Sequence, residues 1–212
     1  MNRYENLFTV SSEFRSDYRV KGSKFFGFLL PCKAAEQADE IVARFRDKFH
    51  DATHHCYAFR VNPVEISEFS QDDGEPAGTA GAPILNVLKS DQLVNVIAVV
   101  VRYYGGTKLG KSGLIEAYGK AAKICTEKAD IKRVIQVQEF SISFDYDKQN
   151  IIDTLNHQFS WIELYAEYKE TVTMKIACPI IKLDEFRKRI SSVKHQLINV
   201  EELNKTFHIT GR

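Results

Sequence analysis

Apolar residues recur along this chain at two spacings, one typical of helices and the other of strands. Residues 94–104 are nearly continuous in Val and Ile, which predicts a strand buried on both faces. Residues 34–49 carry apolar side chains at helical spacing, which predicts an amphipathic helix. The same criteria predict strands at 25–30, 55–61 and 64–69 and helices at 79–89 and 113–128, the last with Ser112 as its N-cap.

After about residue 131 the alternation of strands and helices starts again. The expected elements are strands at 134–144, 161–168, 171–177 and 197–209, and helices at 148–159 and 184–193. Their order is β-α-β-β-α-β, which is the order of the ferredoxin-like fold. We therefore predict an α+β protein with two domains, residues 1–130 and residues 131–212.

The composition is that of a globular protein with no strong excess of charge. The 212 residues carry a formal net charge of +1, which argues against a uniformly basic nucleic-acid binder but leaves a local basic patch open. The four cysteines are far apart and form no C-x-x-C pair, so neither a zinc ribbon nor a disulfide scaffold is indicated. The longest apolar stretch, 96–101, is far shorter than the roughly 20 residues that span a bilayer. We expect a cytoplasmic protein with no membrane partner.

A basic, glycine-rich segment at residues 102–113 is the first candidate site. Glycine lets a backbone approach an anion closely, and the lysines of this segment supply positive charge. The spacing of the nucleotide-binding P-loop is absent, so contact with RNA phosphates is one interpretation and a purely structural turn is the other. The candidate phosphate-binding residues are Lys21, Lys24, Arg102, Tyr103, Tyr104, Gly105, Gly106, Lys108, Gly110 and Lys111. Candidates for base stacking, with a place in the core as the alternative, are Tyr57, Phe59, Tyr103 and Tyr104.

An acidic segment is the second candidate site. Its carboxylates, on Asp72, Asp73 and Glu75, are ligands that Mg²⁺ accepts, and His54 could add a nitrogen ligand. The alternative is a polar turn whose carboxylates cap the helix that starts near Thr79. We expect no cofactor, with Mg²⁺ at these five residues as the alternative.

Several long motifs resemble one known family. Residues 72–83 and 99–110, together with 21–25 and 52–58, resemble the signature of the IMPACT/YigZ family. The resemblance implies a first domain with the fold of the second domain of ribosomal protein S5. It implies a second domain similar to the last domain of elongation factor G. Many relatives have Gly-Gly where this chain has Ser112-Gly113.

The resemblance also implies a role in translation. Eukaryotic relatives are linked to its control through a regulator of an initiation-factor kinase, and for bacterial relatives nucleic-acid or ribosome binding is the usual suggestion. Our first hypothesis is a non-catalytic, translation-associated factor that binds RNA or the ribosome through the basic surface. The second is a metal-assisted hydrolase or phosphoryl-transfer enzyme that uses the acidic segment. The third is a regulator of translation that acts through a protein partner. The sequence does not set the oligomeric state.

Overall fold

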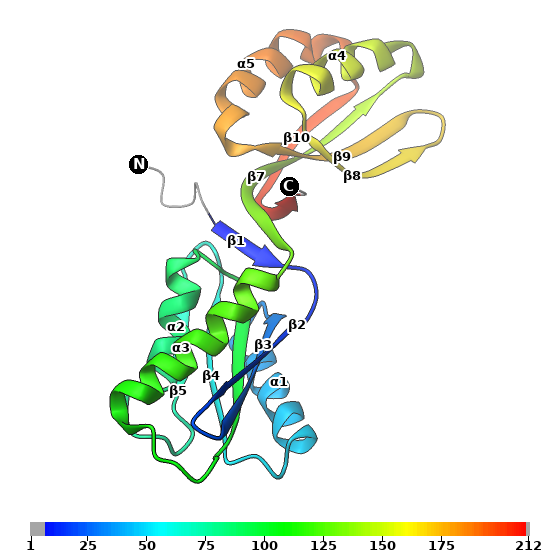
Figure 1. Ribbon diagram of the computed structural model, residues 1–212. Coiled ribbons are helices and arrows are strands. Elements are labelled where there is room, and N and C mark those ends of the chain that lie inside the picture. Colours follow the sequence, from blue (N-terminus) through cyan, green and yellow to red (C-terminus); the bar gives the residue numbers. More distant parts are fainter. Residues whose placement is uncertain (1–6, 211–212) are drawn as a thin grey trace. The chain divides into compact units, whose positions relative to one another are not determined.

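The computed structural model describes residues 7–210, which divide into two compact units (Figure 1). Within that range the N-terminal unit comprises residues 7–134 and 209–210, and the C-terminal unit comprises Ile135–His208. No helix in this range is both long enough and apolar enough to cross a membrane.

The N-terminal unit is built on a five-stranded sheet in which every pair of neighbouring strands is antiparallel. Its strands, in spatial order, are β2 (Phe14–Val20), β3 (Ser23–Pro31), β6 (Val96–Tyr103), β4 (His54–Val61) and β5 (Ser67–Gln71). A short strand, β1 (Leu7–Val10), pairs instead with the first residues of β7 (Ile131–Phe144).

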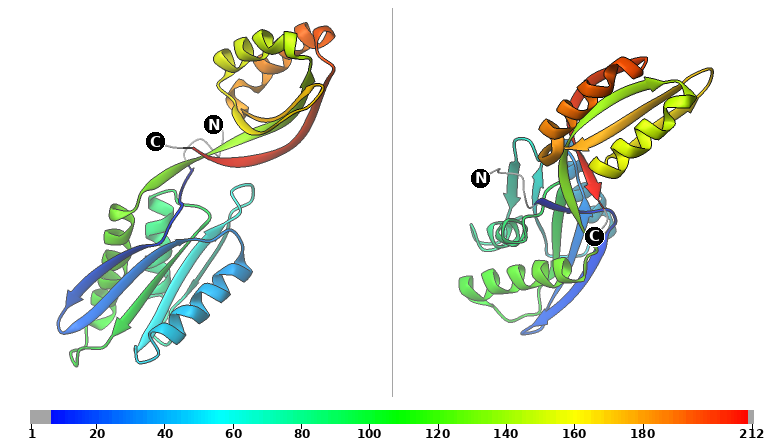
Figure 2. Two further views of the ribbon diagram at one scale, coloured as in Figure 1. Left: turned by 90° about the vertical axis from the view of Figure 1, so that its right-hand side faces the viewer. Right: turned by 90° about the horizontal axis from the view of Figure 1, so that it is seen from above.

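Helices cover both faces of this sheet (Figure 2). Helix α1 (Ala35–Lys48) packs on one face, and helices α2 (Gly81–Ser90) and α3 (Gly110–Lys128) pack on the other. Successive residues of β6 point alternately to the two faces, so Val99 contributes to the core under α1 and Val100 to the core under α2 and α3. Burial on both faces is the reason that this strand is almost entirely Val, Ile and Ala.

The C-terminal unit has the β-α-β-β-α-β element order expected from the sequence pattern. Its strands lie in the order β8 (Ile162–Tyr168), β9 (Val172–Pro179), β7 and β10 (Asn199–Thr210). Helices α4 (Gln149–Phe159) and α5 (Leu183–Val193) share one apolar core with the sheet. Short 3₁₀ turns lie at Tyr146–Lys148, Ile180–Lys182 and Lys194–Gln196.

Candidate functional site

One end of the N-terminal sheet, at the bottom in Figure 1, gathers both segments that the sequence singled out. In the strand register, Lys24 lies opposite Tyr103, and His54 lies opposite Arg102. The connections that begin or end at these residues therefore meet at one end of the sheet. We call this end the loop end; it comprises residues 21–24, 49–54, 72–80 and 102–111.

A buried ion pair joins the acidic and basic segments. The Arg102 side chain is buried, and its guanidinium pairs with the equally buried Glu75 carboxylate. The hydroxyl group of Tyr118, on α3, donates a second hydrogen bond to Glu75 at 2.7 Å. A further nitrogen of Arg102 donates to Ser23 Oγ at 3.3 Å. The charge of Arg102 is therefore neutralised inside the protein, which leaves its guanidinium without free charge for the phosphate contact expected from the sequence.

The carboxylate of Asp72 caps helix α2. Its two oxygens accept hydrogen bonds from the backbone N–H groups of Gly78, Ala80 and Gly81 at 2.8–2.9 Å. Partial burial acts to raise the pKa of Asp72, but the three N–H donors outweigh it and hold the pKa below its ordinary value. Of the two interpretations of the acidic segment, capping is the one that the structure shows for this residue.

Replacing Asp72 with alanine is expected to lower the free energy of unfolding by about 1 kcal/mol at neutral pH, since two backbone N–H groups at the start of α2 and one in the preceding turn lose their acceptor. Because the pKa in the folded state is depressed, this stabilisation is present above the unfolded-state pKa and is lost as the pH falls through the folded-state value. The difference in the free energy of unfolding between the wild type and Asp72→Ala, measured by urea titration, should therefore shrink below about pH 4. Asp39→Ala removes an exposed carboxylate on α1 and is the matched control. A difference that is constant with pH would contradict the capping role.

The other members of the acidic segment also make contacts within the fold. Asp73 accepts hydrogen bonds from the backbone N–H of His55 at 2.6 Å and from Arg46 at 2.8 Å. A ring nitrogen of His54 lies 2.7 Å from the Asp73 carbonyl oxygen, and the Thr79 hydroxyl group donates to the Pro76 carbonyl oxygen at 2.7 Å. Within residues 7–210, no group of three or more His, Cys, Asp or Glu side chains is placed to hold a metal ion. The Mg²⁺ interpretation therefore receives no support from the geometry of these residues.

Two basic loops touch at the loop end through their backbones. A Cβ atom added to Gly105 would lie 1.9 Å from the carbonyl carbon of Gly22, so only glycine allows this approach. Ser23 Oγ accepts a hydrogen bond from the Gly105 N–H at 3.2 Å and holds the two loops together. The contact places the β2–β3 turn, with Lys21, beside the segment that carries Lys108.

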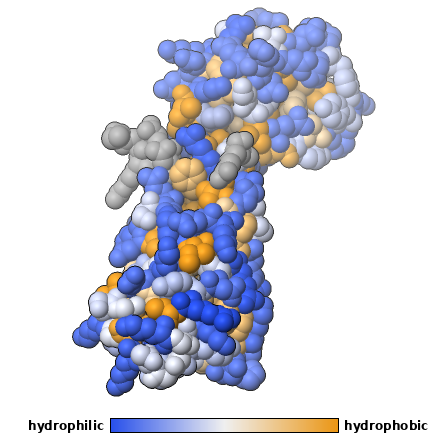
Figure 3. Space-filling view, viewed as in Figure 1, coloured by the Kyte–Doolittle hydropathy of each residue, from blue (hydrophilic) through white to orange (hydrophobic). Residues whose placement is uncertain are grey.

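Four lysines of these loops are presented to solvent. Lys21, Lys24, Lys108 and Lys111 are all exposed, and none forms an ion pair with a carboxylate of residues 7–210. The surface at the lower end of the N-terminal unit in Figure 3 is mainly hydrophilic or intermediate in hydropathy. Gly106 and Gly110 are exposed in the same stretch. The loop end therefore carries positive charge that is available to an anionic ligand.

Helix α3 begins three residues earlier than the sequence indicated. Its first residue is Gly110 and its N-cap is Leu109, so Ser112 lies inside the first turn and is not the cap that was predicted. The first turn contains no acidic residue. The positive end of the helix dipole thus adds to the lysine charges.

The aromatic candidates divide into buried and exposed ones. Tyr57 and Phe59 are 8% and 6% exposed and belong to the core under α1, so the stacking interpretation is wrong for both. Tyr103 is partly buried, and its hydroxyl group donates to Asp51 at 2.7 Å. Tyr104 is 46% exposed. It is the one of the four that presents a large part of its side chain to solvent.

The whole of this site lies within the part of the chain that matches a known protein family. The model of the Impact N-terminal domain family matches residues 21–126, which include every segment of the loop end. The IMPACT family member YigZ of Escherichia coli is 33% identical over 189 residues, covering 86% of this chain and 92% of that protein. A crystal structure described as that of a hypothetical protein is 29% identical, with a TM-score of 0.63 over 94% of this chain and 98% of that one. Yih1, described as a two-domain translational regulator, is 25% identical and covers 61% of this chain and 49% of its own, with a TM-score of 0.36.

Proposed function

The chain belongs to the IMPACT family, and from this premise we propose that it is a non-catalytic, translation-associated factor that binds RNA, free or within the ribosome. The proposed contacts are the ammonium groups of Lys21, Lys24, Lys108 and Lys111. The link to translation rests on the family resemblance, which implies such a role for eukaryotic relatives. The observation that carries the proposal is the set of four exposed lysines that form no ion pair with a carboxylate of residues 7–210, on two loops held together by backbone contact.

The ordered backbone of the loop end supports binding of a polyanion. Because the Gly22–Gly105 approach and the Arg102–Glu75 pair already fix the loops, little conformational entropy is lost when a ligand binds. Phosphate contacts of this kind position a nucleic acid without reading its sequence. We therefore expect weak sequence selectivity and strong dependence on salt.

The same proposal extends to the folds of the two units and to the cellular location. We assign the N-terminal unit to the fold of ribosomal protein S5 domain 2 and the C-terminal unit to the ferredoxin-like fold. The β-α-β-β-α-β order and the strand order β8-β9-β7-β10 support the second assignment. A cytoplasmic location is supported by four cysteines that are all free thiols.

Replacing Lys108 and Lys111 together with alanine is expected to weaken RNA binding by roughly tenfold at low salt, because two phosphate contacts are lost. If four lysines each contact one phosphate, the logarithm of the wild-type association constant should fall with the logarithm of salt concentration with a slope of about −3. The double variant should have a shallower slope, near −1.5 or so. Fluorescence anisotropy with a labelled single-stranded RNA, over a series of salt concentrations, measures both quantities.

A matched control removes the same charge from the opposite end of the unit. Lys33 follows the far end of β3 and Lys128 ends α3; both are exposed. Lys33→Ala/Lys128→Ala should bind RNA with nearly the wild-type affinity and slope. Equal binding by the wild type and the Lys108→Ala/Lys111→Ala variant would refute the proposed surface. A protein partner recovered from a pull-down after nuclease treatment, without RNA binding, would instead favour the protein-interaction hypothesis.

A further inference from the structure

Tyr104 is an exposed aromatic residue whose position is fixed by its own surroundings. It is the first residue after β6, and 46% of its surface is exposed. Its hydroxyl group donates a hydrogen bond to the Gly106 carbonyl oxygen at 2.7 Å. Its backbone N–H donates to Thr53 Oγ1 at 3.0 Å. Both the main chain and the far end of the ring are therefore anchored, although the side chain is open to solvent.

A buried cation lies against the ring of Tyr104. The guanidinium carbon of Arg102 is 5.5 Å from the ring centroid, which is within the range of cation–π interactions. Arg102 cannot move freely, because Glu75 and Ser23 hold its guanidinium. The ring is thus supported by a fixed partner and loses little freedom when a ligand stacks on it.

The anchored ring lies among the exposed lysines. Lys24 is opposite Tyr103 in the register of β3 and β6, and the Gly22–Gly105 contact brings Lys21 next to the residue that follows Tyr104. Lys108 lies four residues after Tyr104 in the same segment. Aromatic rings bordered by positive charge are the typical means of binding single strands, because every base has a face that can stack. A duplex offers only its backbone and grooves to such a surface, since its bases are already stacked.

We propose that the loop end selects single-stranded over double-stranded RNA, with one base stacked on Tyr104 and the lysines on the neighbouring phosphates. This inference rests on the proposed function and adds to it the class of RNA and the residue that selects it. One base is specified because the other aromatic candidates are buried or, for Tyr103, partly buried and bonded to Asp51.

The test compares three RNA probes of equal length, about ten nucleotides, which is within the usual site size for single-strand binding. The probes are an unstructured oligouridine, an abasic strand with the same phosphates, and a duplex. The wild type should bind the oligouridine more tightly than the other two. Tyr104→Ala should weaken oligouridine binding by about 5- to 100-fold, which corresponds to one stacked base, and leave the other two affinities unchanged. Tyr104→Phe keeps the ring and should retain most of the affinity.

A matched control and a second readout separate stacking from damage to the fold. Tyr146 is also exposed, at 51%, and its hydroxyl group also donates to a backbone carbonyl oxygen, that of Lys169. Tyr146→Ala should bind all three probes as the wild type does. A 2-aminopurine placed within the single strand should change its emission on binding to the wild type, and this change should be absent with Tyr104→Ala at saturating protein.

The possible outcomes separate this inference from the proposed function. If Lys108→Ala/Lys111→Ala loses binding but Tyr104→Ala binds the oligouridine normally, the stacking inference is overturned and the proposed function stands. If Tyr104→Ala weakens binding to all three probes equally, the inference is also overturned, because this result indicates general damage to the loop. If the wild type binds none of the probes, both are overturned.

Discussion

Glu75→Ala is expected to lower the free energy of unfolding of the N-terminal unit by about 3–5 kcal/mol, the largest effect of any substitution considered for this protein. The change leaves the Arg102 guanidinium buried without a counter-charge, and it removes the acceptor of the Tyr118 hydroxyl group. Both losses occur where water cannot readily replace the carboxylate, since Arg102 is only 4% exposed. The segments joined by these contacts, which carry Ser23, Glu75, Arg102 and Tyr118, should loosen together.

The measurement must report on the N-terminal unit. The one tryptophan, Trp161, is buried in the core of the C-terminal unit, so its fluorescence follows the unfolding of that unit. Hydrogen exchange at the amides of β6 in increasing urea reports on the N-terminal unit instead. We expect the exchange of these amides to accelerate strongly in Glu75→Ala while the Trp161 transition changes little.

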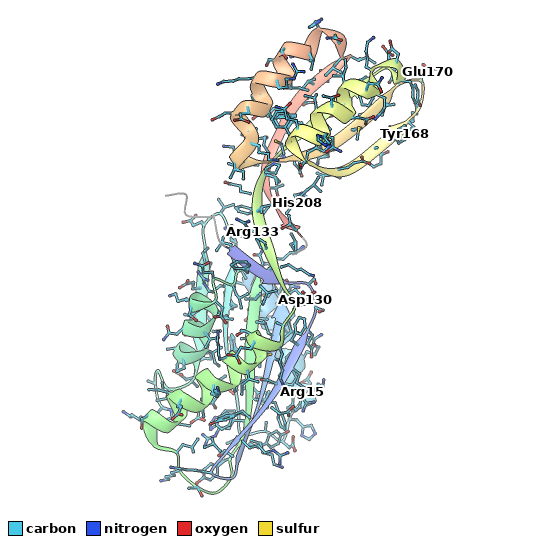
Figure 4. All side chains as sticks on the ribbon, turned by 45° about the horizontal axis from the view of Figure 1, so that its top comes forward. Arg15, Asp130, Arg133, Tyr168, Glu170 and His208 are labelled. Atoms are coloured by element: carbon cyan, nitrogen blue, oxygen red, sulfur yellow. The ribbon has the colours of Figure 1, made fainter. Side chains whose placement is uncertain are left out.

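A surface ion pair provides the control for the loss of charge. Arg15 lies on β2, at the edge of the sheet (Figure 4), and pairs with Asp17 at 3.1 Å. More than half of each side chain is exposed, so Asp17→Ala should cost less than about 1 kcal/mol. The double substitution Arg102→Met/Glu75→Leu should cost less than Glu75→Ala, because no unpaired charge then remains buried. If Glu75→Ala lowered the free energy of unfolding no more than Asp17→Ala does, the buried ion pair would not stabilise the N-terminal unit as its geometry indicates.

The ion pair also connects stability with the proposed binding surface. Arg102 supports the ring of Tyr104 and bonds to Ser23, which in turn holds Gly105. Its buried position makes it a positioning residue for the exposed groups around it. A buried charge with no direct contact to a ligand can thus be needed for binding, and its substitution should affect both the fold and RNA affinity.

The pattern of apolar residues predicted most of the fold for a physical reason. Helix α1 and strand β6 are dominated by burial, and burial leaves a periodic signal in the sequence. Strands β1 and β2 escaped prediction. β1 has four residues, and β2 is an edge strand in which polar side chains such as Arg15 and Asp17 face solvent. Short or solvated strands carry little of this signal.

The site was predicted less completely, because partners that are distant in the sequence decide what a charged residue does. Arg102 and Glu75 are 27 residues apart, and no local pattern pairs them. Capping by Asp72 was one of two interpretations left open by the sequence, because this carboxylate lies eight residues before the N-cap residue Ala80 and not at the position that an N-cap signal specifies. That Lys21, Lys24, Lys108 and Lys111 contact phosphate remains a prediction, as does stacking on Tyr104.

Gly105→Ala is expected to produce the second largest effect. It should lower the free energy of unfolding by about 3 kcal/mol and abolish RNA binding. The added Cβ would lie 1.9 Å from the carbonyl carbon of Gly22 and 2.2 Å from the backbone nitrogen of Ser23. Both contacts are with main-chain atoms, so no side chain can rotate away and the two loops must separate. Separation moves the lysines of one loop away from those of the other.

Gly119→Ala is the matched control for this substitution. Gly119 lies within α3, and an added Cβ would first meet Pro83 at 3.9 Å, an ordinary contact. Alanine at that position should be neutral or stabilising by about 0.5–1 kcal/mol, because glycine is a poor helix former. Urea unfolding and RNA anisotropy on both variants test the contrast. If Gly105→Ala kept wild-type stability and RNA affinity, the backbone contact between the loops would not be what shapes the binding surface.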